Sequence, residues 1–313
     1  MRAYPLSRFA GEGRGEGWGE GPSYTAPMPD NLILLIHCPD REGLVASVTE
    51  AIRRSGGNIV DLDQHVDAMR GVFFMRVAWT PPAEDPDGER RFRPVFAAEV
   101  ATPFAMNWRL ERSASRARLA IFVSRYGHCL YDMLARWESG EWAVEIPLII
   151  SNHNDLEPVA RRHGIRFEHV PVTAATRADA ERTQLELLGE AGVNLVVLAR
   201  YMQIVSPGFI EALGGNVINI HHSFLPAFAG GQPYHAAHAR GVKIIGATSH
   251  YVTADLDAGP IIAQDVVAVS HKDSVEDMVR KGRDLEKIVL ARAVYAHLQH
   301  QVLVYDNRTV VFD

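Results

Sequence analysis

Short apolar runs and amphipathic segments alternate along the chain from residue 32 onward. Residues 32–36, Leu-Ile-Leu-Leu-Ile, predict a buried strand. Apolar residues then recur at helical spacing over 44–52, and Ser55, Gly56 and Gly57 end that helix. Further strands are predicted at 59–66, 72–79 and 107–112, with a second helix at about 91–106. This βαββαβ order is that of a ferredoxin-like α+β domain.

From residue 117 onward, buried strands alternate with helices. Apolar runs predict strands at 119–123, 146–150, 167–170, 195–199 and 217–220, and helices at 155–163 and 177–191. Such alternation is typical of an α/β, Rossmann-like domain whose mostly parallel sheet has helices on both faces. Ligands of such sheets bind beyond the C-terminal ends of the strands, so the residues that directly follow the strands are the candidates for chemistry.

These patterns predict three parts. Residues 1–30 include a run in which glycine alternates with other residues at 11–21, followed by several prolines, and we expect a flexible tail. Residues 31–112 form the ferredoxin-like domain and residues 117–313 the α/β domain, with 113–116 as the linker. A length of 313 residues agrees with two domains, because one domain usually takes about 100–200 residues.

Charge and cysteine content narrow the classes of function. The net charge of −6 argues against nucleic acid as a partner, which would require clustered Lys and Arg. Cys38 and Cys129 lie far apart, so we expect neither a disulfide framework nor a cysteine zinc site. No apolar stretch approaches the ~18 residues of a membrane span, and no secretory signal is evident. We therefore expect a cytoplasmic protein without a membrane partner.

Two polar segments near strand ends carry the candidate chemistry. Asn219 and His221 have strand spacing i, i+2 and so lie on one side of the chain. Asp255 and Asp257 follow in a loop that closes with Gly259-Pro260. An amide, an imidazole and a carboxylate fit water attack on a formamide-type carbonyl, because Asn219 and protonated His221 can donate to the oxyanion. Asp257 can orient the imidazole, keep it cationic or accept the proton of the water.

The same segments resemble a known enzyme family. Asn219-x-His221 with Ser223, Leu225-Pro226, Phe228 and Gly230, together with Asp255-x-Asp257-x-Gly259-Pro260 and Gln264, is similar to the signature of folate-dependent formyl-transfer enzymes. Over residues 31–313 the chain resembles the formyltetrahydrofolate deformylases, with Asp40-Arg41-Glu42-Gly43-Leu44 and Gly127-His128-Cys129-Leu130 among the specific marks. The resemblance implies an N-terminal ACT regulatory domain and a C-terminal formyltransferase-type catalytic domain.

The resemblance also implies an activity and a site. The activity is hydrolysis of 10-formyltetrahydrofolate to formate and tetrahydrofolate, which supplies formate for purine synthesis and balances the one-carbon pool. Asn219, His221 and Asp257 match the catalytic trio. The expected folate contacts are Tyr201, Met202, Gln203, Ile204, Val205 and Asp255, and the expected supporting residues are His128, Ser223 and His235. Folate is the substrate, no cofactor or metal is expected, and a homo-oligomer, a dimer or a tetramer, is implied.

The loop Asp40, Arg41, Glu42, Gly43 leaves two interpretations open. It is either an effector pocket for an amino acid, as an ACT domain implies, or a strand-to-helix turn with an acidic helix cap.

Two departures from the family pattern concern the folate site. Gln203 and Gln232 stand where relatives often have a basic residue, so each removes a cation from the expected pocket.

Three other functions are weighed against hydrolysis. Transfer of the formyl group to glycinamide ribonucleotide would require a phosphate cradle, but loop 123–130 has one glycine beside Tyr126 and His128. A metallohydrolase would require convergent ligands, and the 14 histidines include no H-E-x-x-H motif. A non-enzymatic ACT-type amino-acid sensor would not require the trio, which is intact here.

Overall fold

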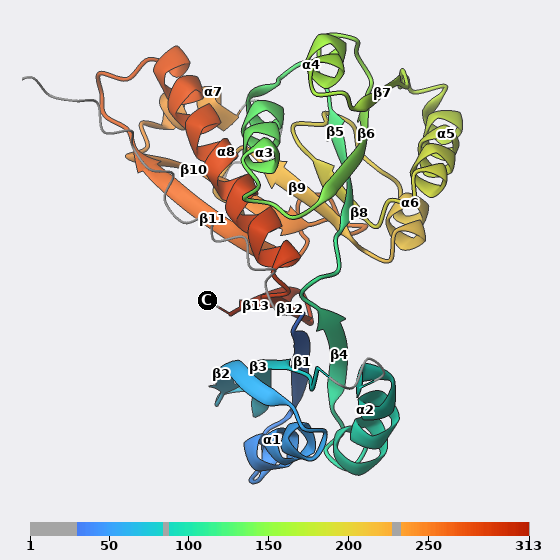
Figure 1. Ribbon diagram of the computed structural model, residues 1–313. Helices are drawn as coiled ribbons and strands as arrows, with labels where there is room; N and C mark the ends of the chain where they lie inside the picture. Colours follow the sequence, from blue (N-terminus) through green and yellow to red (C-terminus); the bar gives the residue numbers. More distant parts are fainter. Residues whose placement is uncertain (1–29, 84–87, 227–232, 313) are drawn as a thin grey trace, which may run out of the picture.

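The computed structural model describes residues 30–83, 88–226 and 233–312, which form three β-sheets and the helices around them (Figure 1). The tail predicted at 1–30 lies outside these residues except for Asp30, and so do Phe228, Gly230 and Gln232. Within the described part of the chain, no helix combines the length and the apolar composition needed to cross a membrane.

The N-terminal sheet has the predicted βαββαβ order. Its elements are β1 (Leu32–Pro39), α1 (Leu44–Arg54), β2 (Asn58–Asp67), β3 (Val72–Thr80), α2 (Gly88–Phe96), the π-helical turn η1 (Ala97–Ala101) and β4 (Asn107–Arg112). The strand order is β2-β3-β1-β4, and every pair is antiparallel. Leu34, Ile36 and Val48 are fully buried between this sheet and its helices, so the ferredoxin-like prediction is confirmed.

The helix predicted at about 91–106 is divided differently in the structure. α2 begins earlier, at Gly88, and changes after Phe96 into the wider turn η1. Pro94 lies inside α2 and has no N–H to continue the helical ladder. The N–H of Thr102 donates to the carbonyl of Ala97 at 2.9 Å, the i→i−5 bond of a π-turn.

The larger sheet has seven strands in the order β11-β10-β9-β8-β5-β6-β7. Its elements are β5 (Arg118–Val123), α3 (His128–Glu138), β6 (Glu145–Ser151), α4 (Glu157–Arg162), β7 (Arg166–His169), α5 (Arg177–Glu190), β8 (Leu195–Leu198), α6 (Pro207–Ala212), β9 (Val217–His221), α7 (Pro233–Arg240), β10 (Ile244–Tyr251), β11 (Ile261–Ala268) and α8 (Val275–Leu298). β5 to β9 pair in parallel, whereas β10 and β11 are antiparallel. The predicted mostly parallel sheet is confirmed.

Helices cover both faces of this sheet (Figure 1). Leu119 and Ile121 of β5 pack in one core with residues of α3 and α8, while Ala120 and Phe122 pack in the opposite core with residues of α5 and α6. The central strand is therefore apolar on both sides, as a parallel strand between two helical layers must be. Each buried Leu or Ile contributes about 1.5–3 kcal/mol relative to exposure.

The strand order reverses between β5 and β8, because the chain runs from β5 to β6 and β7 on one side and to β8 and β9 on the other. Such a switch point opens a crevice beyond the C-terminal ends of the strands. A third, two-stranded sheet, β12 (Val302–Tyr305) with β13 (Arg308–Val311), follows α8.

Candidate active site

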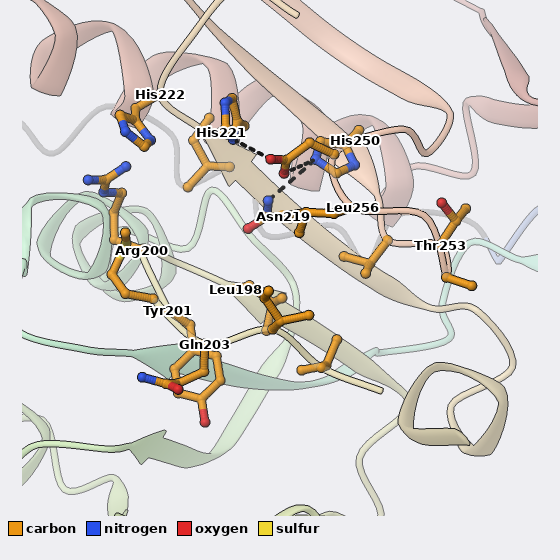
Figure 2. A pocket seen from close by; sticks show the side chains of 17 residues that line it. Leu198, Arg200, Tyr201, Gln203, Asn219, His221, His222, His250, Thr253 and Leu256 are labelled. Atoms are coloured by element: carbon orange, nitrogen blue, oxygen red, sulfur yellow. Dashed lines mark hydrogen bonds and ion pairs between the residues drawn. The ribbon is translucent and has the colours of Figure 1, made fainter. Parts of the chain in front are cut away.

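A cavity lies beyond the C-terminal ends of β8 and β9, next to β10. The predicted trio, Asn219, His221 and Asp257, lines it together with His250 (Figure 2). Asn219 and His221 come from β9, and His250 comes from the antiparallel neighbour β10, where it pairs with Asn219 in register. The structure thus brings residues of β9, of β10 and of the loop after β10 together around one cavity.

His221, which lines the cavity, has one ring nitrogen beside a carboxylate and the other without a partner among the described residues. Its Nδ1 lies 3.2 Å from Oδ2 of Asp257. Its Nε2 is buried and has no hydrogen-bond partner among the described residues. A buried polar nitrogen normally has a partner, so Nε2 is the atom of this side chain that remains available to a substrate or to water.

His250 holds the amide of Asn219. Nδ1 of His250 lies 2.8 Å from the carbonyl oxygen of Tyr251, which can only accept, so Nδ1 carries a proton. In the neutral ring Nε2 then has a lone pair, and Nδ2 of Asn219 lies 3.3 Å from it. One amide hydrogen is used in this bond and the second stays free. His250 was not among the site residues predicted from the sequence.

Asp257 is held ionised by its neighbours. The hydrogen bond from His221 is the largest cause that lowers the pKa of its carboxyl well below the usual range, against the opposing effect of burial. Oδ1 of Asp257 lies 3.7 Å from Nε2 of His250. A carboxylate with so low a pKa is a weak base at neutral pH. Of the three roles predicted for Asp257, the geometry therefore favours orienting the imidazole and stabilising its cationic form.

Arg200 supplies a cation to the cavity wall and was missed in the sequence. It directly follows the buried residues of β8, has a left-handed backbone with φ of 66°, and lines the cavity. Figure 2 shows its guanidinium facing His222. Burial and the nearby charges of Arg200 and His221 lower the pKa of His222 to about 4, so His222 is neutral at physiological pH. Gln203 lines the same cavity.

Behind Arg200 lies a buried carboxylate, Glu286 of α8. One of its oxygens lies 2.7 Å from Nε2 of His128, and the other accepts a hydrogen bond of 2.8 Å from the hydroxyl of Tyr234. Nε of Arg200 lies 3.4 Å from the Glu286 oxygen that contacts His128. Burial alone would raise the pKa of Glu286, but these partners together outweigh it and lower that pKa.

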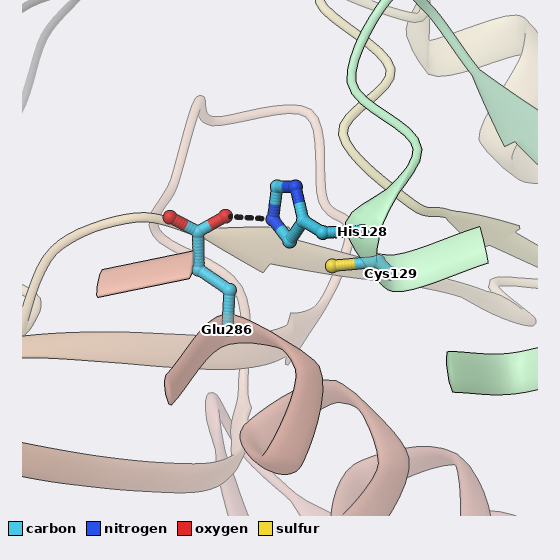
Figure 3. A group of neighbouring side chains, drawn as sticks. All are labelled: His128, Cys129 and Glu286. Carbon is cyan, nitrogen blue, oxygen red and sulfur yellow. Dashed lines mark hydrogen bonds and ion pairs between the residues drawn. The ribbon is translucent and has the colours of Figure 1, made fainter. Parts of the chain in front are cut away.

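Among the described residues, one group brings metal-binding atoms together: His128, Cys129 and Glu286, whose ligand atoms lie within 4.8 Å of one another (Figure 3). Its surroundings suit a hydrogen-bonded network better than a cation. Arg200 already balances the charge of Glu286, and burial raises the pKa of the Cys129 thiol far above its usual range. Thiol ligands bind metals as thiolates, so this thiol is a poor ligand.

The predicted folate residues are distributed unevenly around the cavity. Tyr201, Met202, Gln203, Ile204 and Val205 all line it, whereas Asp255 is exposed and does not. Of the predicted supporting residues, His128 contacts Glu286, and His235 lines a separate cavity along α8 together with His128. Ser223 is buried, and its hydroxyl has no partner among the described residues.

The loop Asp40, Arg41, Glu42, Gly43 is exposed at the end of β1. Gly43 is the N-cap of α1 with φ of 87°, and no side chain caps this helix. The acidic cap of the alternative interpretation is therefore absent. The guanidinium of Arg41 lies 4.5 Å from the ring centre of Phe104 and donates to the carbonyl of Pro103, so it joins the loop to the segment after η1.

Comparisons with known proteins agree with this architecture. Residues 117–294 match the family model described as formyl transferase. A formyltetrahydrofolate deformylase from Synechocystis sp. is 52% identical over 282 residues, which covers 89% of this chain and 97% of that protein. The solved structure of a deformylase from Pseudomonas syringae is 48% identical with a TM-score of 0.86, covering 92% of this chain and 96% of its own. A glycinamide ribonucleotide transformylase from Symbiobacterium toebii is 32% identical with a TM-score of 0.59, over 63% of this chain.

The fold of residues 117–294 is thus that of a formyl transferase-type domain, and an N-terminal α+β part is added to it. The transformylase structure covers 63% of this chain, whereas the deformylase structure covers 92% of it. The deformylases are therefore similar to this chain over both of its parts. The chain belongs to the formyltetrahydrofolate deformylase family.

Proposed function

We propose that Asn219, His221 and Asp257 catalyse the hydrolysis of 10-formyltetrahydrofolate to formate and tetrahydrofolate. The reaction is that of the family, and one observation supports these roles above all. The imidazole of His221, a residue that lines the cavity, is fixed on Asp257 through Nδ1, while its Nε2 is buried and unpartnered among the described residues. Nucleophilic and acid–base sites use this arrangement, in which a third group orients the base.

The proton path follows from that arrangement. Neutral His221 keeps its proton on Nδ1, towards Asp257, so the lone pair of Nε2 accepts a proton from water as the water oxygen bonds to the formyl carbon. The carbonyl electrons move to oxygen and form a tetrahedral oxyanion. The imidazolium, stabilised by Asp257, then protonates the leaving nitrogen as the carbon–nitrogen bond breaks. Tetrahydrofolate leaves, and formic acid loses its proton to solvent.

Asn219 stabilises the oxyanion. Its amide donates one hydrogen to Nε2 of His250, which fixes the side chain, and the second hydrogen is directed to the oxyanion. A donor that is positioned before the reaction pays no reorganisation cost, and one such donor accounts for about 10²–10³ in rate. His250 thus acts through Asn219 as a positioning residue.

The wall opposite the trio suits a flat, partly apolar ligand. Met202 and Ile204 are about half exposed, and Tyr201 is buried with its hydroxyl accepting from Gln184 at 2.9 Å. We propose that segment 201–205 and loop 252–256 hold the folate, with backbone groups and Gln203 supplying polar contacts. No metal or other cofactor enters this mechanism.

The proposal also covers the two domains, the assembly and the cellular compartment. Residues 31–112, which have their own sheet and core, form an ACT regulatory domain that binds an amino acid, and residues 117–313 form the catalytic domain. The assembly is a homo-oligomer, a dimer or a tetramer. Cys38 and Cys129 are both buried free thiols, which suits the reducing cytoplasm.

The test is a product assay on the full-length protein. Formate and tetrahydrofolate are measured from 10-formyltetrahydrofolate with the wild type, His221→Gln and Asn219→Ala. We expect His221→Gln to lower kcat by about 10²–10⁴-fold and Asn219→Ala by about 10²–10³-fold. His169→Gln, at the exposed end of β7, is the matched control. Wild-type turnover in His221→Gln would refute the proposed roles.

A further inference from the structure

The hairpin β12–β13 lies between the N-terminal sheet and the catalytic part of the chain (Figure 1). Its strands pair from Val302↔Val311 to Tyr305↔Arg308, which leaves Asp306 and Asn307 as the turn. Asp306 has a left-handed backbone with φ of 51°, a conformation that Asp tolerates better than most residues. The turn and one strand contact the catalytic side, while the apolar face contacts the N-terminal sheet.

The turn reaches the residue next to Asp257. Nδ2 of Asn307 donates a hydrogen bond of 2.7 Å to the carbonyl oxygen of Ala258. Two residues further along the hairpin, the hydroxyl of Thr309 donates to the carbonyl oxygen of Ile261. Two side chains of one hairpin therefore hold the backbone on the C-terminal side of Asp257.

The segment that they hold requires support. Asp257 itself has a left-handed backbone with φ of 54°, which a residue other than glycine keeps only when its surroundings impose it. On the other side of the segment, the N–H of Tyr251 donates to the carbonyl of Pro260 at 2.9 Å. Gly259 lies so close to β10 that a Cβ atom there would be 1.8 Å from the carbonyl oxygen of Tyr251. The loop is thus confined between β10 and the hairpin.

The opposite face of the hairpin is fixed on the N-terminal sheet. Leu303 and Phe312 are buried with Ile33, Leu35 and Phe74 in one apolar cluster. The ring of Tyr305 meets that of Phe74 edge-on, with 5.3 Å between the centroids. At the turn, Nη1 of Arg70 lies 3.1 Å from Oδ2 of Asp306, the residue before Asn307.

We propose that Asn307 is a positioning residue for Asp257, and that the C-terminal hairpin transmits the state of the N-terminal sheet to the catalytic carboxylate. The inference rests on the proposed role of Asp257. A hairpin fixed on one side by apolar packing and on the other by two donors to the catalytic loop moves both together. A shift of the sheet therefore changes how Asp257 meets His221, and catalysis is sensitive to misplacement of about 1 Å.

The decisive variant is Asn307→Asp, which keeps the size of the side chain but replaces the N–H donor with an acceptor that repels the carbonyl of Ala258. We expect kcat to fall by about tenfold or more, with a smaller change in KM, and amide hydrogen exchange of residues 253–261 to accelerate. Asn307→Ala should act in the same direction. If Asn307 served packing alone, Asn307→Asp would keep a kcat and an exchange rate of residues 253–261 near those of the wild type.

Further variants test the connection and guard against misfolding. Thr309→Val removes the second donor at constant shape, and Tyr305→Ala loosens the contact with Phe74; each should accelerate exchange in 253–261. Arg308→Ala, exposed on the same hairpin, is the matched control. Wild-type exchange in folded Asn307→Asp and Thr309→Val would overturn the inference. Because exchange does not depend on chemistry, wild-type turnover in Asp257→Asn would instead overturn the proposed function.

Discussion

Nδ1 of His221 lies 3.2 Å from Oδ2 of Asp257, and the opposite nitrogen of the same ring is buried without a partner among the described residues. This pairing fixes both the orientation of the imidazole and the position of its proton. The carboxylate stays ionised, because the hydrogen bond from His221 lowers its pKa. In the proposed mechanism, Asp257 therefore acts on the reaction through His221.

Asp257→Asn is expected to lower kcat by at least about 10²-fold, the lower range for a positioned acid–base group. The amide can present an N–H to Nδ1 of His221, which moves the ring proton to Nε2 and removes the lone pair that accepts from water. The melting temperature should change little, since the side chain keeps its shape. Steady-state kinetics and thermal unfolding provide the measurement. Asp63→Asn, an exposed carboxylate of β2, is the control, and equal turnover in both variants would contradict the assignment.

Activity is expected to be unaffected by a chelator. The reason is that Glu286 is occupied by His128, Tyr234 and Arg200, which leaves Cys129 and His128 without a free carboxylate partner. Formate release is measured after dialysis against a chelator, with metal content determined on the same sample. Cys129→Ser should retain turnover under both conditions. Loss of activity in the chelator with recovery on added zinc would show that the His128, Cys129 and Glu286 group binds a metal.

Much of this arrangement could be predicted from the sequence, and the failures have physical causes. Strands such as 119–123 and 195–199 are continuous apolar runs, because both of their faces are buried. No element was assigned to β10, because its buried positions include Thr248, Ser249 and His250. The side chains of these residues hydrogen-bond to Ser223 and to Asn219 of β9. A hydropathy pattern cannot distinguish such a strand from a loop.

The trio could be predicted because Asn219, His221 and Asp257 lie in recognisable local motifs. Arg200 and Glu286 could not, since they are far apart in sequence and meet only when α8 packs against the sheet. A weak signal existed for each. Arg200 directly follows a buried strand, where ligand-binding residues collect, and Glu286 is a carboxylate among the apolar positions of α8. Asn307 had no such signal, because its partner is a backbone carbonyl.

The free energy of unfolding is expected to fall as pH decreases from about 6.5 towards 4. Burial is the main cause that lowers the pKa of His222, His297 and His300 to about 4. Between these limits the unfolded chain binds protons that the folded chain does not, so acid favours unfolding, by up to about 1.4 kcal/mol per pH unit for each histidine. Urea unfolding at pH 7 and pH 5 measures the slope. His297→Gln should reduce it, and an unchanged slope would show that His297 is protonated in the folded protein.

The loop between β5 and α3 bears on the choice of water as acceptor. Gly127 is the N-cap of α3, and a Cβ there would lie 2.9 Å from the side chain of Leu156, so the glycine serves close packing. The ring of Tyr126 lies under the guanidinium groups of Arg200 and Arg283, at 5.6 and 5.2 Å. Arg200 is further bound to buried Glu286. The loop is thus occupied by side chains that already have partners.

Glycinamide ribonucleotide is therefore expected not to accept the formyl group. A transferase must hold its amine substrate, and a phosphate is held by backbone N–H groups only where side chains leave them open. Here Tyr126 and His128 flank the only glycine of loop 124–130, and His128 is bound to Glu286. With no amine fixed beside the formyl carbon, water is the nucleophile that His221 can activate. The measurement supplies 10-formyltetrahydrofolate with and without saturating glycinamide ribonucleotide and follows both products. Formate should appear at the same rate in each case, whereas accumulation of the formylated nucleotide at the expense of formate would show that this loop binds an acceptor.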